Sequence, residues 1–233
     1  FMPMAEQTDL MRDLTDHVLQ MALRQCAAWH RSGIEVGVAV NASARNLHDF
    51  RFPNRIRSFL AEVGLEPRWL ELEITENTIM EDPRRSRAVL AELRALGVSA
   101  SIDDFGTGYS SLASLRNLTI DRIKIDRSFV TGLADSDADL TIVRSVVELG
   151  RNLGLATVAE GVETDEILRI VRELGVDEFQ GYIASHPLPP DELEPVLIHG
   201  FFDMDALDDD ESPAEASNVV ALERSHGVRT GQN

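Results

Sequence analysis

Cysteine is almost absent from the sequence, and long apolar runs are absent altogether. Cys26 is the only thiol among the 233 residues, so no disulfide framework can form, as is usual for proteins of a reducing cytoplasm. No run of about eighteen apolar residues occurs, which excludes a membrane-spanning helix within this sequence. We therefore expect a cytoplasmic location, although a longer protein containing the chain could be tethered to a membrane through segments before Phe1.

Basic residues are also scarce. Lys and Arg total 22 against 40 Asp and Glu, which gives a net charge of −18. This balance argues against a protein that binds nucleic-acid polymers, because such proteins carry a basic stripe. No Gly-x-Ser-x-Gly turn and no P-loop motif is present, so a serine hydrolase and a nucleotide kinase lack support. An anionic substrate would need metal ions to bind here.

The acidity is strongest at the C-terminal end. Residues 201–233 contain eight acids and two arginines around Asp208-Asp209-Asp210-Glu211, and we predict that this stretch is a disordered, solvated tail. Residues 1–200 are predicted to form one domain, without a long polar linker. Because residue 1 is Phe and no Met precedes it, we expect the chain to be part of a longer protein.

Helix and strand patterns alternate along residues 1–200. Apolar residues at helical spacing predict helices over 8–31, 51–63, 83–96, 110–117, 137–153, 164–174 and 190–198. Short apolar runs predict strands over 35–40, 69–75, 99–103, 121–126, 155–159 and 178–183. The alternation indicates a parallel sheet with helical crossovers.

Polar side chains fall at or near the carboxyl end of every predicted strand. They are Asn41, Glu73, Asp103, Lys124, Glu160 and Gln180. An open, doubly wound sheet does not need a functional residue on each strand, whereas a closed barrel brings all strand ends to one rim, where active sites lie. We therefore predict an α/β fold of the (β/α) TIM-barrel type. Because such a barrel has eight strands, we predict that about six are present and that the first two precede Phe1.

Two adjacent carboxylates, Asp103 and Asp104, precede the glycine-rich stretch Phe105-Gly106-Thr107-Gly108. Neighbouring side chains of a regular strand point to opposite faces. Both acids can serve one site if the strand ends between them and the glycines let the backbone turn. A hard cation would favour that arrangement, because it takes carboxylate oxygens from converging directions. For this motif alone, a strand-to-helix turn capped by Asp is an equal alternative.

The acids and the amide of the rim offer oxygen ligands only, and this set suits Mg²⁺ or Mn²⁺ better than zinc. Two ions bridged by Asp103 and Asp104 could stabilise the attacking and leaving oxygens of a phosphoryl displacement. Lys124 could hold the attacking water or a phosphate oxygen; its alternative role is an ion pair with Asp126 or another acid. Glu76 could brace the glycine-rich loop, or could simply be an acid at a helix N-terminus.

Six spaced motifs resemble those of one family. They are Asn41-Ala42-Ser43, Glu71-Leu72-Glu73-Ile74-Thr75-Glu76, Asp103-Asp104-Phe105-Gly106-Thr107-Gly108-Tyr109-Ser110-Ser111-Leu112, Asp121-Arg122-Ile123-Lys124-Ile125-Asp126, Ala159-Glu160-Gly161-Val162-Glu163-Thr164 and Gln180-Gly181-Tyr182. In order and spacing they are similar to the EAL domain, a family of bacterial phosphodiesterases that open cyclic di-GMP to linear pGpG with two Mg²⁺ or Mn²⁺ ions. The resemblance covers residues 1 to about 200.

The resemblance implies a role for each rim residue. Metal ligands would be Asn41, Glu73, Asp103, Asp104 and Glu160, with Asp126 close to the metal shell. Lys124 would position the nucleophilic water, and Glu160 would be catalytic as well as a metal ligand. Glu76 would anchor the loop after Asp104, and Gln180 would lie near the substrate. The family also implies cyclic di-GMP as partner, a homodimer formed through the loop after Asp104, and an upstream sensory or GGDEF domain.

The chain also departs from the family pattern. The Glu-Ala-Leu motif that names the family would lie before Phe1, so one metal-ligating Glu, a phosphate-binding Arg and two strands are missing from this sequence. We therefore expect weak or no activity from these 233 residues alone. One interpretation is a fragment of a cyclic di-GMP phosphodiesterase. The alternative is a catalytically silent module that senses cyclic di-GMP or contacts another protein.

Overall fold

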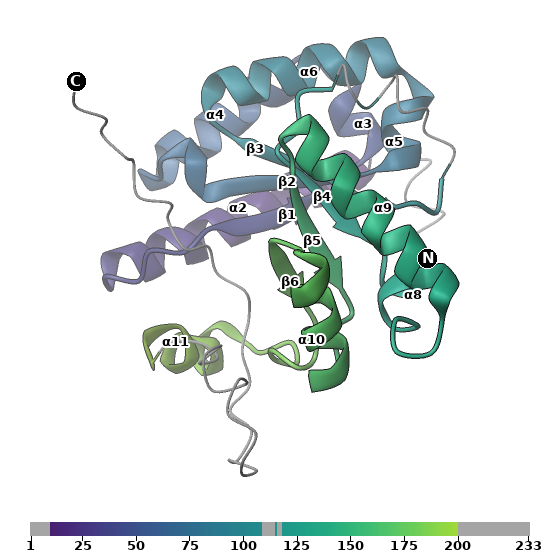
Figure 1. The fold of residues 1–233 in the computed structure, drawn as a ribbon. Coiled ribbons are helices and arrows are strands. Elements are labelled where there is room, and N and C mark those ends of the chain that lie inside the picture. The colour runs from purple at the N-terminus through teal and green to yellow at the C-terminus, as the bar shows by residue number, and fades with distance from the viewer. Residues whose placement is uncertain (1–9, 109–114, 116–117, 200–233) are drawn as a thin grey trace, which may run out of the picture.

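A single parallel sheet organises the chain. In the computed structural model, residues 10–108, 115 and 118–199 are described. Six strands follow one another in the order β1-β2-β3-β4-β5-β6 and pair in parallel throughout. Their bounds are Val38–Asn41, Leu70–Thr75, Ser99–Phe105, Arg122–Ile125, Ala156–Glu160 and Glu178–Gln180. The sheet curls into part of a barrel, and the prediction of an incomplete (β/α) barrel with six strands is confirmed (Figure 1).

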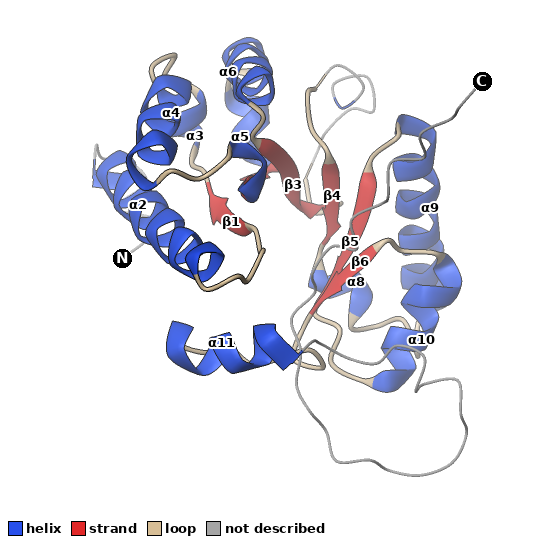
Figure 2. Cartoon of the chain, turned by 90° about the vertical axis from the view of Figure 1, so that its left-hand side faces the viewer, coloured by secondary structure: helices blue, strands red, loops and turns tan. Residues whose placement is uncertain are grey.

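Helices follow the strands and lie outside the curled sheet. The longer ones are α2 (Leu10–Arg31), α4 (Phe52–Val63), α6 (Pro83–Leu96), α9 (Asp137–Leu153), α10 (Asp165–Leu174) and α11 (Pro190–His199). Short helices add α3 (Ala44–Leu47), the 3-10 turn η1 (Pro67–Trp69), α5 (Glu76–Glu81) and α8 (Arg127–Val130). Figure 2 shows the strands with α2, α4 and α6 on one side and α9 and α10 on the other. None of the helices in the described ranges is long and apolar enough to cross a membrane.

Local signals set the helix boundaries close to where the sequence predicts them. Thr164, for example, accepts a hydrogen bond from the amide of Ile167 and so caps the N-terminus of α10, and Asp82 caps α6 in the same way. At the other end of α10 the backbone turns left-handed at Gly175, with φ of 73°, which glycine adopts without steric cost.

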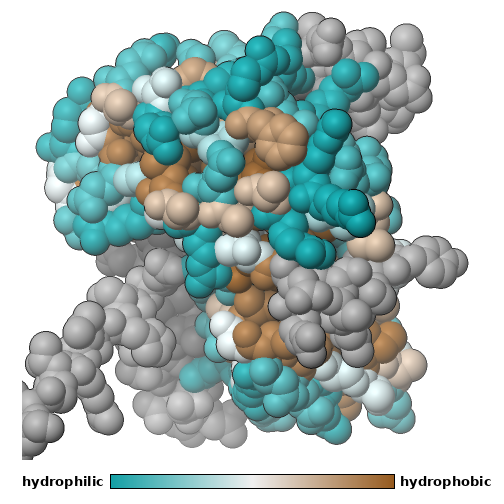
Figure 3. Space-filling view, turned by 90° about the horizontal axis from the view of Figure 1, so that it is seen from above, coloured by the Kyte–Doolittle hydropathy of each residue, from teal (hydrophilic) through white to brown (hydrophobic). Residues whose placement is uncertain are grey.

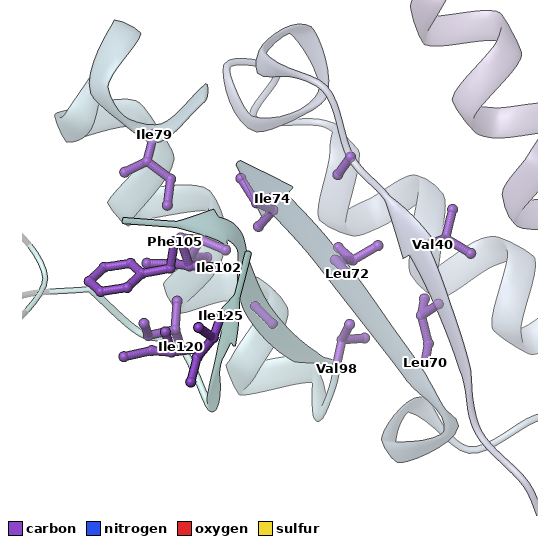
Figure 4. Close-up of a cluster of buried hydrophobic side chains, with 14 of the residues drawn as sticks. Val40, Leu70, Leu72, Ile74, Ile79, Val98, Ile102, Phe105, Ile120 and Ile125 are labelled. Atoms are coloured by element: carbon purple, nitrogen blue, oxygen red, sulfur yellow. The ribbon is translucent and has the colours of Figure 1, made fainter. Parts of the chain in front are cut away.

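The main core lies between the convex face of the sheet and the helices. Along β2 the buried residues alternate with half-buried ones, so that Leu70, Leu72 and Ile74 all face the helices (Figure 4). Each of these side chains is completely buried, and such burial stabilises a protein by about 1.5–3 kcal/mol per residue. The other face of the strand, with Glu71 and Glu73, is therefore free to carry polar groups on the concave side.

Helix α11 packs elsewhere. Its Leu193 and Leu197 contact a small second cluster of Trp29, Ile34 and Val36, at the end of α2 and the chain before β1. Figure 2 shows α11 between α2 and α10, the helices at the two ends of the fold. On the face seen from above, hydrophilic side chains surround separate hydrophobic patches (Figure 3).

Two predicted strands differ from the observed ones by three residues at one end. The first was expected over 35–40, but β1 begins at Val38, where pairing with β2 begins, and Ile34 and Val36 before it belong to the cluster that α11 contacts. The sixth was expected over 178–183, but β6 ends at Gln180, and the chain turns at residues 181–184. The helix predicted over 110–117 lies almost entirely outside the described residues, as do the predicted tail and the start of the first helix.

Candidate metal centre

Both adjacent aspartates reach one side of the sheet, although not by the route that the sequence predicts. The expectation that the strand ends between Asp103 and Asp104 is wrong, because β3 continues to Phe105. Instead the register against β4 shifts: Ile102 pairs with Ile123, and Phe105 pairs with Ile125. Two residues of β3 therefore oppose the single residue Lys124, as in a β-bulge. Asp104 adopts a φ of 53°, the only positive value among the described residues other than glycine.

Lys124 occupies the centre of the rim. Its ammonium nitrogen lies 2.7 Å from a carboxylate oxygen of Glu73, 3.0 Å from Asp103 and 2.6 Å from Glu160. The side chain is only 6% exposed. Burial alone would lower the pKa of Lys124, but the carboxylates of Glu73 and Glu160 outweigh it and raise the pKa, so the group is a permanent cation. Of the alternative role, an ion pair with Asp126 or another acid, the structure shows the second form, because acids of three strands pair with this one lysine.

Three carboxylates form a cluster that could hold a metal ion. One oxygen each from Asp103, Asp104 and Glu160 lies within 4.8 Å of the others. Burial, joined by the charges of Asp103 and Asp126, raises the pKa of Asp104. Burial likewise raises the pKa of Glu160, against the opposing effect of Lys124. Asp103 Oδ1 is buried and faces Lys124 Nζ at 3.0 Å without a well-aligned hydrogen bond. Converging carboxylate oxygens fit a hard divalent cation.

The sequence motifs that carry these rim residues match a known family. The family model described as "EAL domain" matches residues 1–187. The chain belongs to the EAL domain family.

Known relatives agree with the assignment. The cyclic di-GMP phosphodiesterase NbdA of Pseudomonas aeruginosa is 42% identical over 204 residues, which is 87% of this chain and 26% of the relative. MucR of the same organism, a bifunctional diguanylate cyclase and cyclic di-GMP phosphodiesterase, is 42% identical over 83% of this chain and 28% of its own length. The solved structure of the PaMucR phosphodiesterase in complex with c-di-GMP superposes with a TM-score of 0.79 at 42% identity, over 83% of this chain and 78% of that one. The chain thus spans about a quarter of the length of these curated relatives.

The remaining rim residues end or follow strands of the same sheet. Asn41 ends β1 and pairs in register with Glu73. Gln180 ends β6 and pairs with Glu160. Asp126 follows β4 and caps α8 by accepting a hydrogen bond from the amide of Ser128 at 3.0 Å. Burial opposes ionisation of Asp126, but its hydrogen bonds from Ser128 lower the pKa overall. All six strands therefore deliver a polar side chain to their carboxyl ends, as the sequence predicts.

Glu76 lies beneath the glycine-rich loop. It is 4% exposed at the start of α5, and a methyl group added at Gly108 would meet the Glu76 carboxylate at 2.9 Å. Only glycine lets the loop backbone approach this carboxylate so closely. The contact supports the role of Glu76 as anchor of the loop after Asp104. Most of the loop beyond Gly108 lies outside the described residues.

One charged group of the concave face was missed from the sequence. Arg122 of β4 pairs with Glu71 of β2 at 2.6 Å and with Glu178 of β6 at 3.2 Å. These three residues stand two positions before Lys124, Glu73 and Gln180 respectively. The spacing of two residues between each of these and its rim neighbour can be read from the sequence, because both lie on one strand. The contact of Arg122 with Glu71 and Glu178 cannot, because it joins strands up to about a hundred residues apart.

Proposed function

We propose that this EAL domain hydrolyses cyclic di-GMP to linear pGpG. The observation that carries the proposal is the convergence of Glu73, Asp103 and Glu160 on Lys124, with Asp104 beside them. The activity named for NbdA and the ligand in the PaMucR structure support it. In the reaction a water oxygen bonds to phosphorus, the bond from phosphorus to the ribose 3′ oxygen breaks, and that oxygen leaves as a hydroxyl.

Phosphodiesterases of this family depend on metal ions, and the cluster at the rim could hold one. We infer that two Mg²⁺ or Mn²⁺ ions are used here, held by Asn41, Glu73, Asp103, Asp104 and Glu160, with Asp126 near them. When bound, they would neutralise phosphate charge and lower the pKa of a coordinated water. The absence of cysteine and histidine from this set favours these ions over zinc.

The residues of the chain have separable tasks in this proposal. Lys124 holds the attacking water with an ammonium that stays charged. Glu160, beside Lys124, accepts a proton from that water. Gln180, next to Glu160 on the adjoining strand, contacts the nucleotide. Glu76 fixes the loop that follows Asp104 through the close approach of Gly108.

Partners and location form a further part of the proposal. The relatives are about four times as long as the matched region, and MucR is named as bifunctional, which supports an accompanying sensory or GGDEF domain. We infer a homodimer through the loop after Asp104, which sedimentation of the protein with and without cyclic di-GMP would test. A cytoplasmic site of action fits the single buried thiol Cys26.

The decisive experiment is hydrolysis by the full-length protein that contains this chain. Cyclic di-GMP is incubated with protein and Mn²⁺, and pGpG is quantified by chromatography. We expect metal-dependent pGpG formation that Glu160→Gln abolishes and that Glu173→Gln, an exposed acid on α10, leaves unchanged. Binding of cyclic di-GMP without pGpG formation in saturating Mn²⁺ would overturn the enzymatic proposal and favour a sensing module.

A further inference from the structure

We propose that Arg122 is a positioning residue that ties β2 to β6 across the concave face and so sets the spacing of Glu73, Glu160 and Gln180 at the rim. The proposal rests on the phosphodiesterase function inferred above, because the rim matters only if it binds metal and nucleotide. In this proposal Arg122 acts through the strands that carry the rim and not by contact with the metal or the nucleotide.

The geometry of the link is specific. Arg122 Nη1 lies 2.6 Å from Glu71 Oε2, and Arg122 Nε lies 3.2 Å from Glu178 Oε1. The guanidinium therefore uses two different nitrogens, one toward each side of β4. The side chains are 13%, 19% and 29% exposed for Arg122, Glu71 and Glu178, so solvent screens this network less than it screens a surface pair.

This network forms a layer directly below the rim. In a strand, residues two apart point to the same face and lie about 6.6 Å apart along the strand. Each member of the layer is therefore the neighbour of one rim residue: Glu71 of Glu73, Arg122 of Lys124, Glu178 of Gln180. A shift of any of the three strands in the lower layer moves the corresponding side chain at the rim.

Strand β6 depends most on this layer. It has three residues and pairs with β5 alone within the described part of the chain. The ion pair from Arg122 to Glu178 reaches past β5 and fixes β6 to the centre of the sheet. Immediately after Gln180, the chain turns at Gly181, where a methyl group would clash with Val162. Gln180 thus sits between a cross-sheet ion pair and a tight turn, and its position follows from both.

Lysine cannot replace arginine in this role. A single ammonium on a flexible stem can approach one carboxylate well, whereas the planar guanidinium holds two in fixed directions. A lysine at position 122 should therefore keep the fold, because the charge is retained, but should weaken the connection between Glu71 and Glu178. This separates positioning from simple charge balance, because Arg122→Lys preserves the net charge of the layer.

Hydrogen exchange of the 233-residue chain in EDTA tests the link without metal or activity. The amide of Val162 donates to the carbonyl of Gln180 at 3.1 Å and reports on β6. We expect Arg122→Lys to speed exchange at Val162 and along the β5–β6 ladder about tenfold while leaving the β2–β3 ladder unchanged. Arg68→Lys, which alters an exposed pair with Glu66, is the control. Equal acceleration everywhere, or none at Val162, would overturn the positioning role.

Kinetics of the full-length protein supply the second readout. We expect Arg122→Lys and Glu178→Gln each to lower kcat/KM for cyclic di-GMP and weaken Mn²⁺ binding by 10–100-fold, as outer-shell changes do, with melting temperatures close to wild type. The double variant should lose no more than either single one, because both act through the same link. Additive losses, or unchanged kinetics in an active wild type, would overturn the proposal. An inactive wild type overturns the phosphodiesterase proposal instead, and the exchange experiment then decides on Arg122 alone.

Discussion

Lys124 Nζ and Glu160 Oε1 lie 2.6 Å apart across two neighbouring strands, with the lysine almost wholly buried. The pairing brings a buried ammonium and a carboxylate to one point at the carboxyl ends of β4 and β5. Glu73 and Asp103 complete the surroundings of the lysine. Removing these charged groups from water has a desolvation cost, which their mutual attraction offsets. Loss of one member of the group therefore leaves the others buried without their partner.

Replacement of Lys124 by Met should depress turnover of cyclic di-GMP by the full-length protein at least about 100-fold, since a water-positioning group is lost. It should also leave Glu73, Asp103 and Glu160 without a counter-charge, so Mn²⁺ should raise the melting temperature more in this variant than in wild type. Arg144→Met, at an exposed position of α9, is the matched control. Wild-type turnover in Lys124→Met would remove Lys124 from the mechanism.

Substitutions at Asp104 should separate its backbone role from its carboxylate role. Asn tolerates the left-handed backbone, so Asp104→Asn should keep the free energy of unfolding near wild type while weakening Mn²⁺ binding. Asp104→Ala should weaken Mn²⁺ binding as much and, in addition, lower the free energy of unfolding by about 1 kcal/mol. Calorimetric titration with Mn²⁺ and urea denaturation measure the two effects. Equal stability of both variants would show that the bulge does not need this side chain.

Gly108→Ala should displace the loop, because the new methyl group meets the Glu76 carboxylate at 2.9 Å. We expect a clear loss of turnover in the full-length protein. The loss due to Gly108→Ala should be smaller in a Glu76→Ala background, where the obstructing carboxylate is gone. Gly37→Ala, whose methyl group would make an ordinary 3.4 Å contact, controls for the glycine change itself. An identical loss in both backgrounds would argue against the contact.

The thiol of Cys26 should make stability depend on alkaline pH. Cys26 is fully buried, and burial raises its pKa from 9.0 to about 11. A raised pKa means that the folded state favours the neutral thiol. The contribution of the neutral Cys26 thiol to the free energy of unfolding is therefore complete below pH about 9 and is lost as the pH rises through about 11. The free energy of unfolding of wild type relative to Cys26→Ala should fall by roughly 1–2 kcal/mol between pH 8 and pH 10.5.

Urea denaturation of both proteins at several pH values measures this difference. Alkylation supplies an independent check, since the native thiol should react far more slowly than the unfolded one at pH 9. A difference that stays constant from pH 8 to pH 10.5 would show that Cys26 titrates normally in the folded chain.

Much of this protein is determined by local sequence. The period of two in β2 and the helical period of α9, with their caps and terminal glycines, depend on neighbours within a few residues, so the elements and the choice of oxygen ligands at strand ends can be predicted. The parallel order follows from the alternation of those elements.

Only the tertiary structure decided how the side chains meet. The register shift that turns Asp103 and Asp104 to one side depends on pairing between β3 and β4, which local pattern does not specify. The ion pairs of Lys124 with Glu73, Asp103 and Glu160, and those of Arg122 with Glu71 and Glu178, depend on the curl of the sheet, which brings β2 and β6 toward β4. A strand carries the residue types of a site in its sequence, but the distances between strands arise from packing over the whole sheet, and those distances bring the carboxylates of this rim together around Lys124.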